Sequence, residues 1–160
     1  MSIQITDVAS VSKKLESLGL GKVNGLSLLP DNLDDAKSVD QLLQQTEADT
    51  VRTLLRINKI PYTELFDDEH QPPYIQNYSY EWFGPTLLFS ASLLTQDPNL
   101  TTVILGLLTN YLSDLFKGGS QGKVSLNIVI ESADGSYKKI AYEGSPENLN
   151  SVVAVVERLK

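Results

Sequence analysis

The sequence lacks cysteine altogether and has only one histidine among its 160 residues. Without cysteine the chain cannot form disulfide bonds, thiolate zinc sites or a cysteine nucleophile. A Ser–His–Asp hydrolase would have to use His70, and the G-x-S-x-G motif that presents the nucleophilic serine of many hydrolases is missing. We therefore expect no catalytic residue, no cofactor-binding residue and no enzymatic activity.

Positive charge is missing from the middle of the chain. Residues 60–116 contain no Lys or Arg but seven Asp and Glu, so this segment carries the excess behind the net charge of −7. Such a segment repels nucleic-acid phosphates and anionic lipid headgroups. The sequence therefore predicts a protein that does not bind nucleic acid.

The run Asp67-Asp68-Glu69-His70 is the one cluster of potential metal ligands in the sequence. Four consecutive residues rarely converge on one ion, and the spacing of an EF-hand loop is absent. We interpret the run as a solvated acidic loop and expect no metal site.

No apolar run reaches the roughly 20 residues that a membrane-spanning helix needs. Residues 85–95 form a run of eleven and residues 100–116 a run of seventeen, and joining them would bury Asp97 and Pro98 in the lipid. We interpret both runs as central helices that fill a core or an interface. Membrane association through residues 85–116 is the alternative.

The second run predicts self-association, because monomers rarely expose a large apolar patch. Apolar side chains repeat at helical spacing along residues 100–116, more than the C-terminal elements can cover. We expect a homo-oligomer, with the outer edge of the C-terminal hairpin as the alternative contact. The expected interface residues are Leu100, Ile104, Leu107, Leu108 and Tyr111.

The N-terminal part predicts helices. Ile5, Val8 and Val11 follow a 3–4 spacing over residues 5–18, a second helix is expected from about Ser38, and a third ends before Pro61. The chain starts without a basic region followed by an apolar one, which favours a cytoplasmic protein.

An irregular loop with many aromatic residues follows. Pro72 and Pro73 prevent a helix, and five of the twelve aromatic side chains fall within ten residues. Aromatic faces next to acidic residues favour a basic partner segment, whereas the alternative is that the rings pack the loop onto the core. The expected partner-binding residues are Tyr74, Tyr78, Tyr80, Trp82 and Phe83.

The C-terminal third predicts a β-hairpin and a helix. Apolar residues alternate from Val124 to Ile130, Asp134-Gly135 is a favoured hairpin turn, and Ser145-Pro146 suits a helix start. The whole chain is then an α+β protein with a helical N-terminal region, two apolar central helices and a C-terminal ββα unit. Residues 1–84 and 85–160 are the two parts of what we expect to be one compact domain.

In element order, residues 100–160 resemble the small effector-associated constant components of bacterial conflict (defence) systems. The matching segments are TTVILGLLTNYLSDLFKG, KVSLNIVIESADGSYKKIAYEGS and PENLNSVVAVVERL. This resemblance implies an adaptor that accompanies an effector and catalyses nothing.

We expect a non-enzymatic adaptor or regulatory protein that acts by protein–protein interaction in a bacterial defence or signalling system. The alternatives are a membrane-associating or pore-related component and an enzyme with a carboxylate site that no motif marks.

Overall fold

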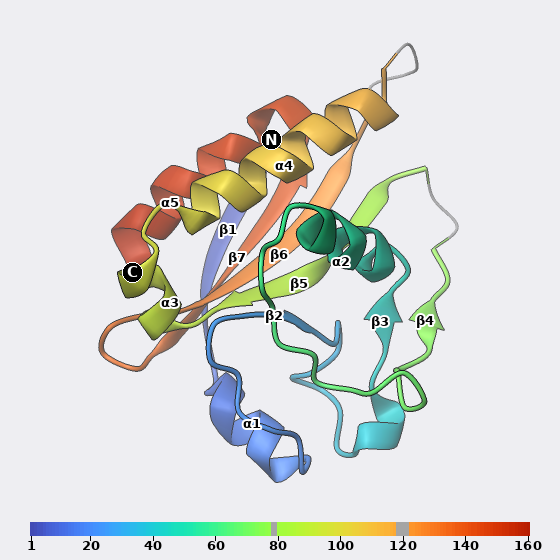
Figure 1. The fold of residues 1–160 in the computed structure, drawn as a ribbon, viewed down its shortest axis with the longest axis vertical. Coiled ribbons are helices and arrows are strands. Elements are labelled where there is room, and N and C mark those ends of the chain that lie inside the picture. Colours follow the sequence, from blue (N-terminus) through green and yellow to red (C-terminus); the bar gives the residue numbers. More distant parts are fainter. Residues whose placement is uncertain (78–79, 118–121) are drawn as a thin grey trace.

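The computed structural model describes residues 1–77, 80–117 and 122–160. Within them, five strands form one mixed sheet in the order β1-β7-β6-β5-β2 (Figure 1). Only β5 and β6 are parallel, and every other neighbouring pair is antiparallel. The strands are β1 (Ser2–Val8), β2 (Leu26–Leu29), β5 (Trp82–Phe89), β6 (Val124–Glu131) and β7 (Tyr137–Gly144).

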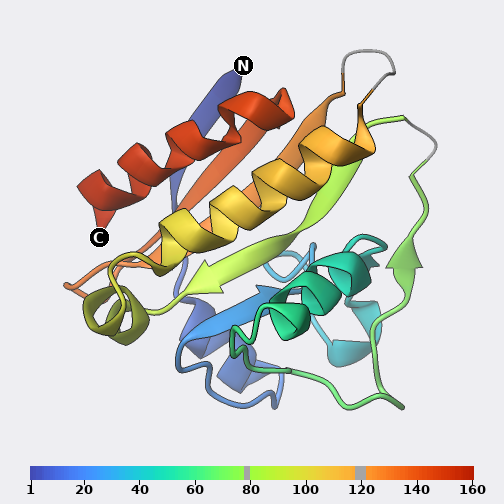
Figure 2. The same cartoon turned by 45° about the horizontal axis from the view of Figure 1, so that its top comes forward.

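Helices cover one face of this sheet. Figure 2 shows α5 (Val152–Leu159) and α4 (Leu100–Leu115) side by side on the sheet, with α2 (Ala48–Ile57) beyond α4. The short helix α3 (Ala91–Gln96) and α4 form the crossover that the parallel pair β5–β6 requires. Side chains of all three large helices share one core with the sheet, including Val51, Leu105 and Val156.

The opposite face carries a smaller core. Helix α1 (Val11–Ser17) packs there against Leu88 and Val129 of the sheet, and we call this side the α1 face. A short two-stranded parallel ribbon, β3 (Gln44–Gln45) and β4 (Tyr74–Ile75), follows the 3-10 turn Val39–Gln41. The second 3-10 turn, Pro146–Ser151, leads into α5.

The predicted fold class was wrong for the N-terminal region, which begins with a strand instead of a helix. Residues 2–8 pair with β7 over seven successive positions, from Ser2–Glu143 to Val8–Tyr137. Ile3 and Ile5 alternate with polar residues, and this period of two prevails over the 3–4 spacing once a neighbouring strand is present. The helix expected from Ser38 is also reduced to one 3-10 turn.

The first apolar run is likewise a strand and not a central helix. Pro85 to Phe89 belong to β5, which lies between β6 and β2 and is buried on both faces. A strand buried on both faces reads as a continuous apolar run, so alternation could not reveal it. Ser90 then caps α3, its hydroxyl accepting a hydrogen bond from the Leu93 amide at 3.2 Å.

The hairpin and the C-terminal helix lie where the sequence placed them. Strands β6 and β7 pair from Val124–Gly144 to Glu131–Tyr137, and Gly135 adopts a φ of 86° in the connection. The connection is longer than the two residues expected. The hydrogen bond that closes it joins the Ser132 amide to the Ser136 carbonyl at 2.8 Å. In the described part of the chain, no helix is both long and apolar enough to cross a bilayer.

Candidate functional site: a polar groove on the α1 face

Two rows of side chains cross the α1 face of the sheet beyond the area that α1 covers. Apart from Phe83, every residue in these rows is small or polar, so few bulky side chains rise above the backbone of the sheet there. In the strand order β1, β7, β6, β5, the rows are Ser2, Glu143, Ser125, Phe83 and Gln4, Ala141, Asn127, Thr86. The next row contains Val129 and Leu88, which α1 covers. Thr86 is itself buried, so the exposed part of the second row ends at Asn127.

These rows form the floor of a groove of about 490 Å³. Its wall comes from the segments around the β3–β4 ribbon, namely Asp31, Gln45, Ile75 and Asn77. The Asn77 side-chain amide donates to Gln45 Oε1 at 2.8 Å, and Gln45 Nε2 donates to Asp31 Oδ1 at 3.1 Å. This chain of hydrogen bonds orients amide and carboxylate groups along the wall.

A network around Arg52 fixes the ribbon to α2. The guanidinium contacts Asp49 Oδ1 at 2.8 Å, Glu64 Oε1 at 3.1 Å and Gln44 Oε1 at 3.2 Å, and the Arg52 side chain is only 11% exposed. Gln44 also donates to the Pro72 carbonyl at 2.7 Å. The groove wall is therefore supported by charged and amide groups from three separate segments.

The groove carries negative charge. Among the described residues that line it, Asp31 and Glu143 are charged, and none is Lys or Arg. At its end, Ser125 donates to Glu81 Oε1 at 2.6 Å, and Lys123 Nζ lies 3.7 Å from both Glu81 and Glu143. The arrangement favours neutral or basic polar groups as ligands.

The four described aromatic residues that were predicted to bind a partner do not gather on one surface. Tyr74 is half-exposed on β4 and its hydroxyl donates to Asp49, which raises the pKa of Tyr74. Tyr80 is fully exposed, and Tyr78 lies outside the described residues.

Trp82 and Phe83 are neighbours on β5 and point to opposite faces of the sheet. Trp82 is buried in the core beneath the helices, as the alternative interpretation of the loop expected, whereas Phe83 lines the groove. Of the four predicted residues that the structure describes, Phe83 is the one that lines this groove. Partner binding by the exposed rings stays a prediction.

The residues predicted to form the oligomer interface lie mostly against the protein's own core. Ile104 and Leu108 are buried by the sheet and neighbouring helices, while Leu100, Leu107 and Tyr111 are partly buried. The outer hairpin edge is occupied too, because β1 pairs with β7. These surfaces are therefore largely used within one chain.

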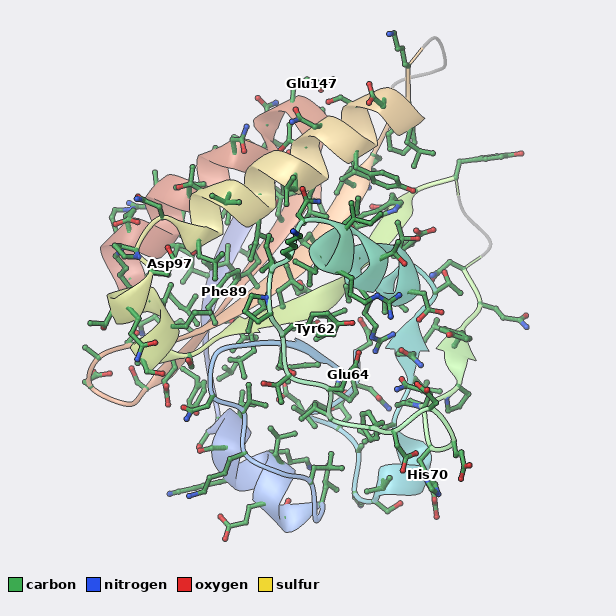
Figure 3. All side chains as sticks on the ribbon, viewed as in Figure 1. Tyr62, Glu64, His70, Phe89, Asp97 and Glu147 are labelled. Atoms are coloured by element: carbon green, nitrogen blue, oxygen red, sulfur yellow. The ribbon has the colours of Figure 1, made fainter. Side chains whose placement is uncertain are left out.

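The acidic run is exposed on a peripheral loop, where Figure 3 labels His70 far from Phe89 and Glu147. His70 Nδ1 lies 2.5 Å from Asp67 Oδ1, and this hydrogen bond lowers the pKa of Asp67. In residues 1–77, 80–117 and 122–160, no three His, Asp or Glu side chains are placed to hold a metal ion.

A larger hollow of about 960 Å³ lies where α4 ends near the start of β1. Its lining includes Lys117 and Lys123 as well as Glu143 and Glu147. We take the groove as the candidate site because a chain of hydrogen bonds orients the polar groups of its wall.

Sequence reasoning missed most of the groove residues. The alternation in β6 does assign Ser125 and Asn127 to the polar side of a strand, which is a signal for the floor. Nothing local indicates that Gln4, Gln45 and Asn77 meet the same surface, because they are brought there by strand pairing across the chain. Comparisons with protein-family models, with curated proteins and with solved structures found no match to this chain.

Proposed function

We propose that this protein is a non-enzymatic adaptor that binds an extended, neutral or basic segment of another protein in the groove on the α1 face. The observation that carries the proposal is the floor itself: apart from Phe83 and the buried Thr86, its two rows present small and polar side chains that the α1 packing leaves uncovered. A low, polar sheet surface beside a wall of amide groups suits a peptide, whose backbone needs hydrogen-bond partners.

The charge of the groove supports the choice of ligand. Asp31 and Glu143 line it, so a Lys or Arg side chain would gain an attraction that an acidic segment would lose. An adaptor role also agrees with what the resemblance of residues 100–160 implies. In this proposal the protein works in the bacterial cytoplasm beside a defence or signalling effector.

Selection from a random peptide library, followed by fluorescence polarisation with the selected peptides, tests the proposal. Ala141→Phe fills the floor of the groove and should weaken binding by about tenfold or more, because a ring would occupy the place of the ligand. Ala154→Phe, on the exposed side of α5, is the matched control and should bind like the wild type.

Charge reversal separates the ligand classes. Glu143→Lys should lower affinity for basic peptides, whereas Glu16→Lys on exposed α1 should not. Selection of acidic peptides alone, or unchanged binding by Ala141→Phe, would contradict the proposal.

A further inference from the structure

The two edges of the sheet differ in how they are protected. At the β2 edge, the Thr63 amide donates to the Leu26 carbonyl at 2.8 Å and the Ser27 hydroxyl donates to the Thr63 carbonyl at 2.9 Å. A loop therefore covers this short edge strand. At the other edge, β7 is the only strand that pairs with β1 in the described residues.

Strand β1 has none of the usual features that prevent edge pairing. It pairs with β7 over seven residues without a bulge and contains no Pro and no Lys. Its only charge, Asp7, lies near its end and binds Lys138 Nζ at 2.5 Å, a contact that raises the pKa of Lys138. Because this charge lies at the end of the strand and is paired within the chain, residues 2–6 present no charged side chain at the edge.

The side chains of β1 are complementary to a second copy of the same strand. With two antiparallel β1 strands and Gln4 opposite Gln4, Ile3 faces Ile5 of the other copy and Ser2 faces Thr6. Within residues 2–6 every pair then matches apolar with apolar or polar with polar, and Asp7 lies beyond them, opposite Met1. Moving the centre to Ile5 would instead place Ile3 opposite Asp7.

We propose that two copies of this chain associate through antiparallel pairing of their β1 strands, centred on Gln4, to form one continuous ten-stranded sheet. A two-fold axis perpendicular to the sheet keeps the helix-covered faces on the same side. The pairing uses the open backbone groups of β1 and covers Ile5, which is 43% exposed in one chain.

The same dimer would join the two grooves. Ser2 and Gln4 belong to the groove floor, so with Gln4 on the axis the floor of one copy continues into that of the other. The pairing itself does not depend on the proposed function. The dimer proposal is tested by the mass in solution and by cross-linking, and the groove proposal is tested separately by peptide binding.

Single cysteines test both the contact and its register, because the chain has no cysteine of its own. Directly opposed residues in an antiparallel pair have Cα atoms about 4.5–5.5 Å apart, within reach of a disulfide. Gln4→Cys should therefore give a cross-linked dimer under mild oxidation. Thr6→Cys should not, because the two Thr6 positions lie four residues apart, at roughly 14 Å.

Sedimentation equilibrium measures the association without cross-linking. The wild type should show a mass that rises with concentration toward that of two chains. Ile5→Lys should raise the dissociation constant of the dimer by more than about tenfold, because the new ammonium group would lie opposite Ile3 of the other copy. Ile57→Lys is the control, since Ile57 is a 70% exposed isoleucine on α2, far from β1 in the sequence.

Three outcomes would overturn the proposal. They are a one-chain mass at every concentration, a Thr6→Cys cross-link that forms more readily than that of Gln4→Cys, and equal weakening by Ile5→Lys and Ile57→Lys. Gln4→Cys keeps the test decisive if Ile5→Lys does not fold, because Gln4 is exposed and its replacement removes no core contact.

Discussion

Gly84 occupies a crowded position in an irregular part of β5. The register between β5 and β6 shifts between Phe83 and Thr86, so β5 holds one residue more than its partner there. A Cβ at Gly84 would lie 2.5 Å from the Trp82 ring and 2.7 Å from Leu126. The missing side chain lets Trp82 fill the core while Phe83 turns toward the groove.

Gly84→Ala should therefore destabilise the protein by about 1–3 kcal/mol, because an added methyl group overpacks the core beside Trp82. Gly106 is the matched control, since it lies within α4 and a Cβ there meets no atom within 4 Å. Gly106→Ala should stabilise by up to about 1 kcal/mol through helix propensity. Urea denaturation measures both, and equal effects of the same sign would contradict the packing described.

At the scale of elements, α4 shows how an apolar helix is oriented by what surrounds it. The sheet, α5 and α2 contact it from different sides, and they bury Thr101, Leu105 and Leu112. Val103 and Leu115 are about half-exposed, although their spacing fits an apolar stripe equally well. A helix that is apolar on most sides does not specify its buried face by periodicity alone.

The orientation of α4 predicts unequal costs for two similar truncations. Leu105→Ala removes a fully buried side chain and should cost about 2–5 kcal/mol, as large-to-small core substitutions do. Val103→Ala, at 49% exposure, should change the free energy of unfolding by less than about 1 kcal/mol. Chemical denaturation decides between them, and a larger loss for Val103→Ala would mean that α4 presents its other side to the core.

At the scale of the whole molecule, the sheet joins distant parts of the chain. β1 covers the edge of β7, and β2 covers the edge of β5. Helix α2 adds Val51 and Leu55 to the core that α4 and α5 share. The C-terminal part therefore depends on residues from the N-terminal part for its edges and its core.

This dependence predicts that residues 80–160 do not fold cooperatively alone. Without β1, β2 and α2, both sides of the β5-β6-β7 unit present open edges, and apolar surface is uncovered. Circular dichroism on heating should show no sharp transition for this fragment, in contrast to the intact chain. Mixing the fragment with residues 1–77 should restore part of the cooperative thermal transition. A sharp transition for residues 80–160 alone, matching that of the intact chain, would show that they form an independent domain.

Some residues of the candidate site can be recognised from the sequence around them, whereas others are brought to it from distant parts of the chain. Ser125 and Asn127 are recognisable as the polar side of a strand, because alternation is a property of β6 alone. The groove also needs Gln4 from β1 and Gln45 from β3, which lie far away in the sequence. Trp82 and Phe83 look equivalent in the sequence, but their positions on opposite sides of β5 separate them into core and groove.

The sequence by itself determined the features whose causes are local. The β6–β7 hairpin follows from alternation and a turn around Gly135, α2 ends before Pro61, and α4 occupies nearly the predicted length. Tertiary structure alone decided that residues 2–8 and 85–89 are strands. The backbone groups of a strand are paired with another segment, so a chain read locally cannot show whether that segment will be there.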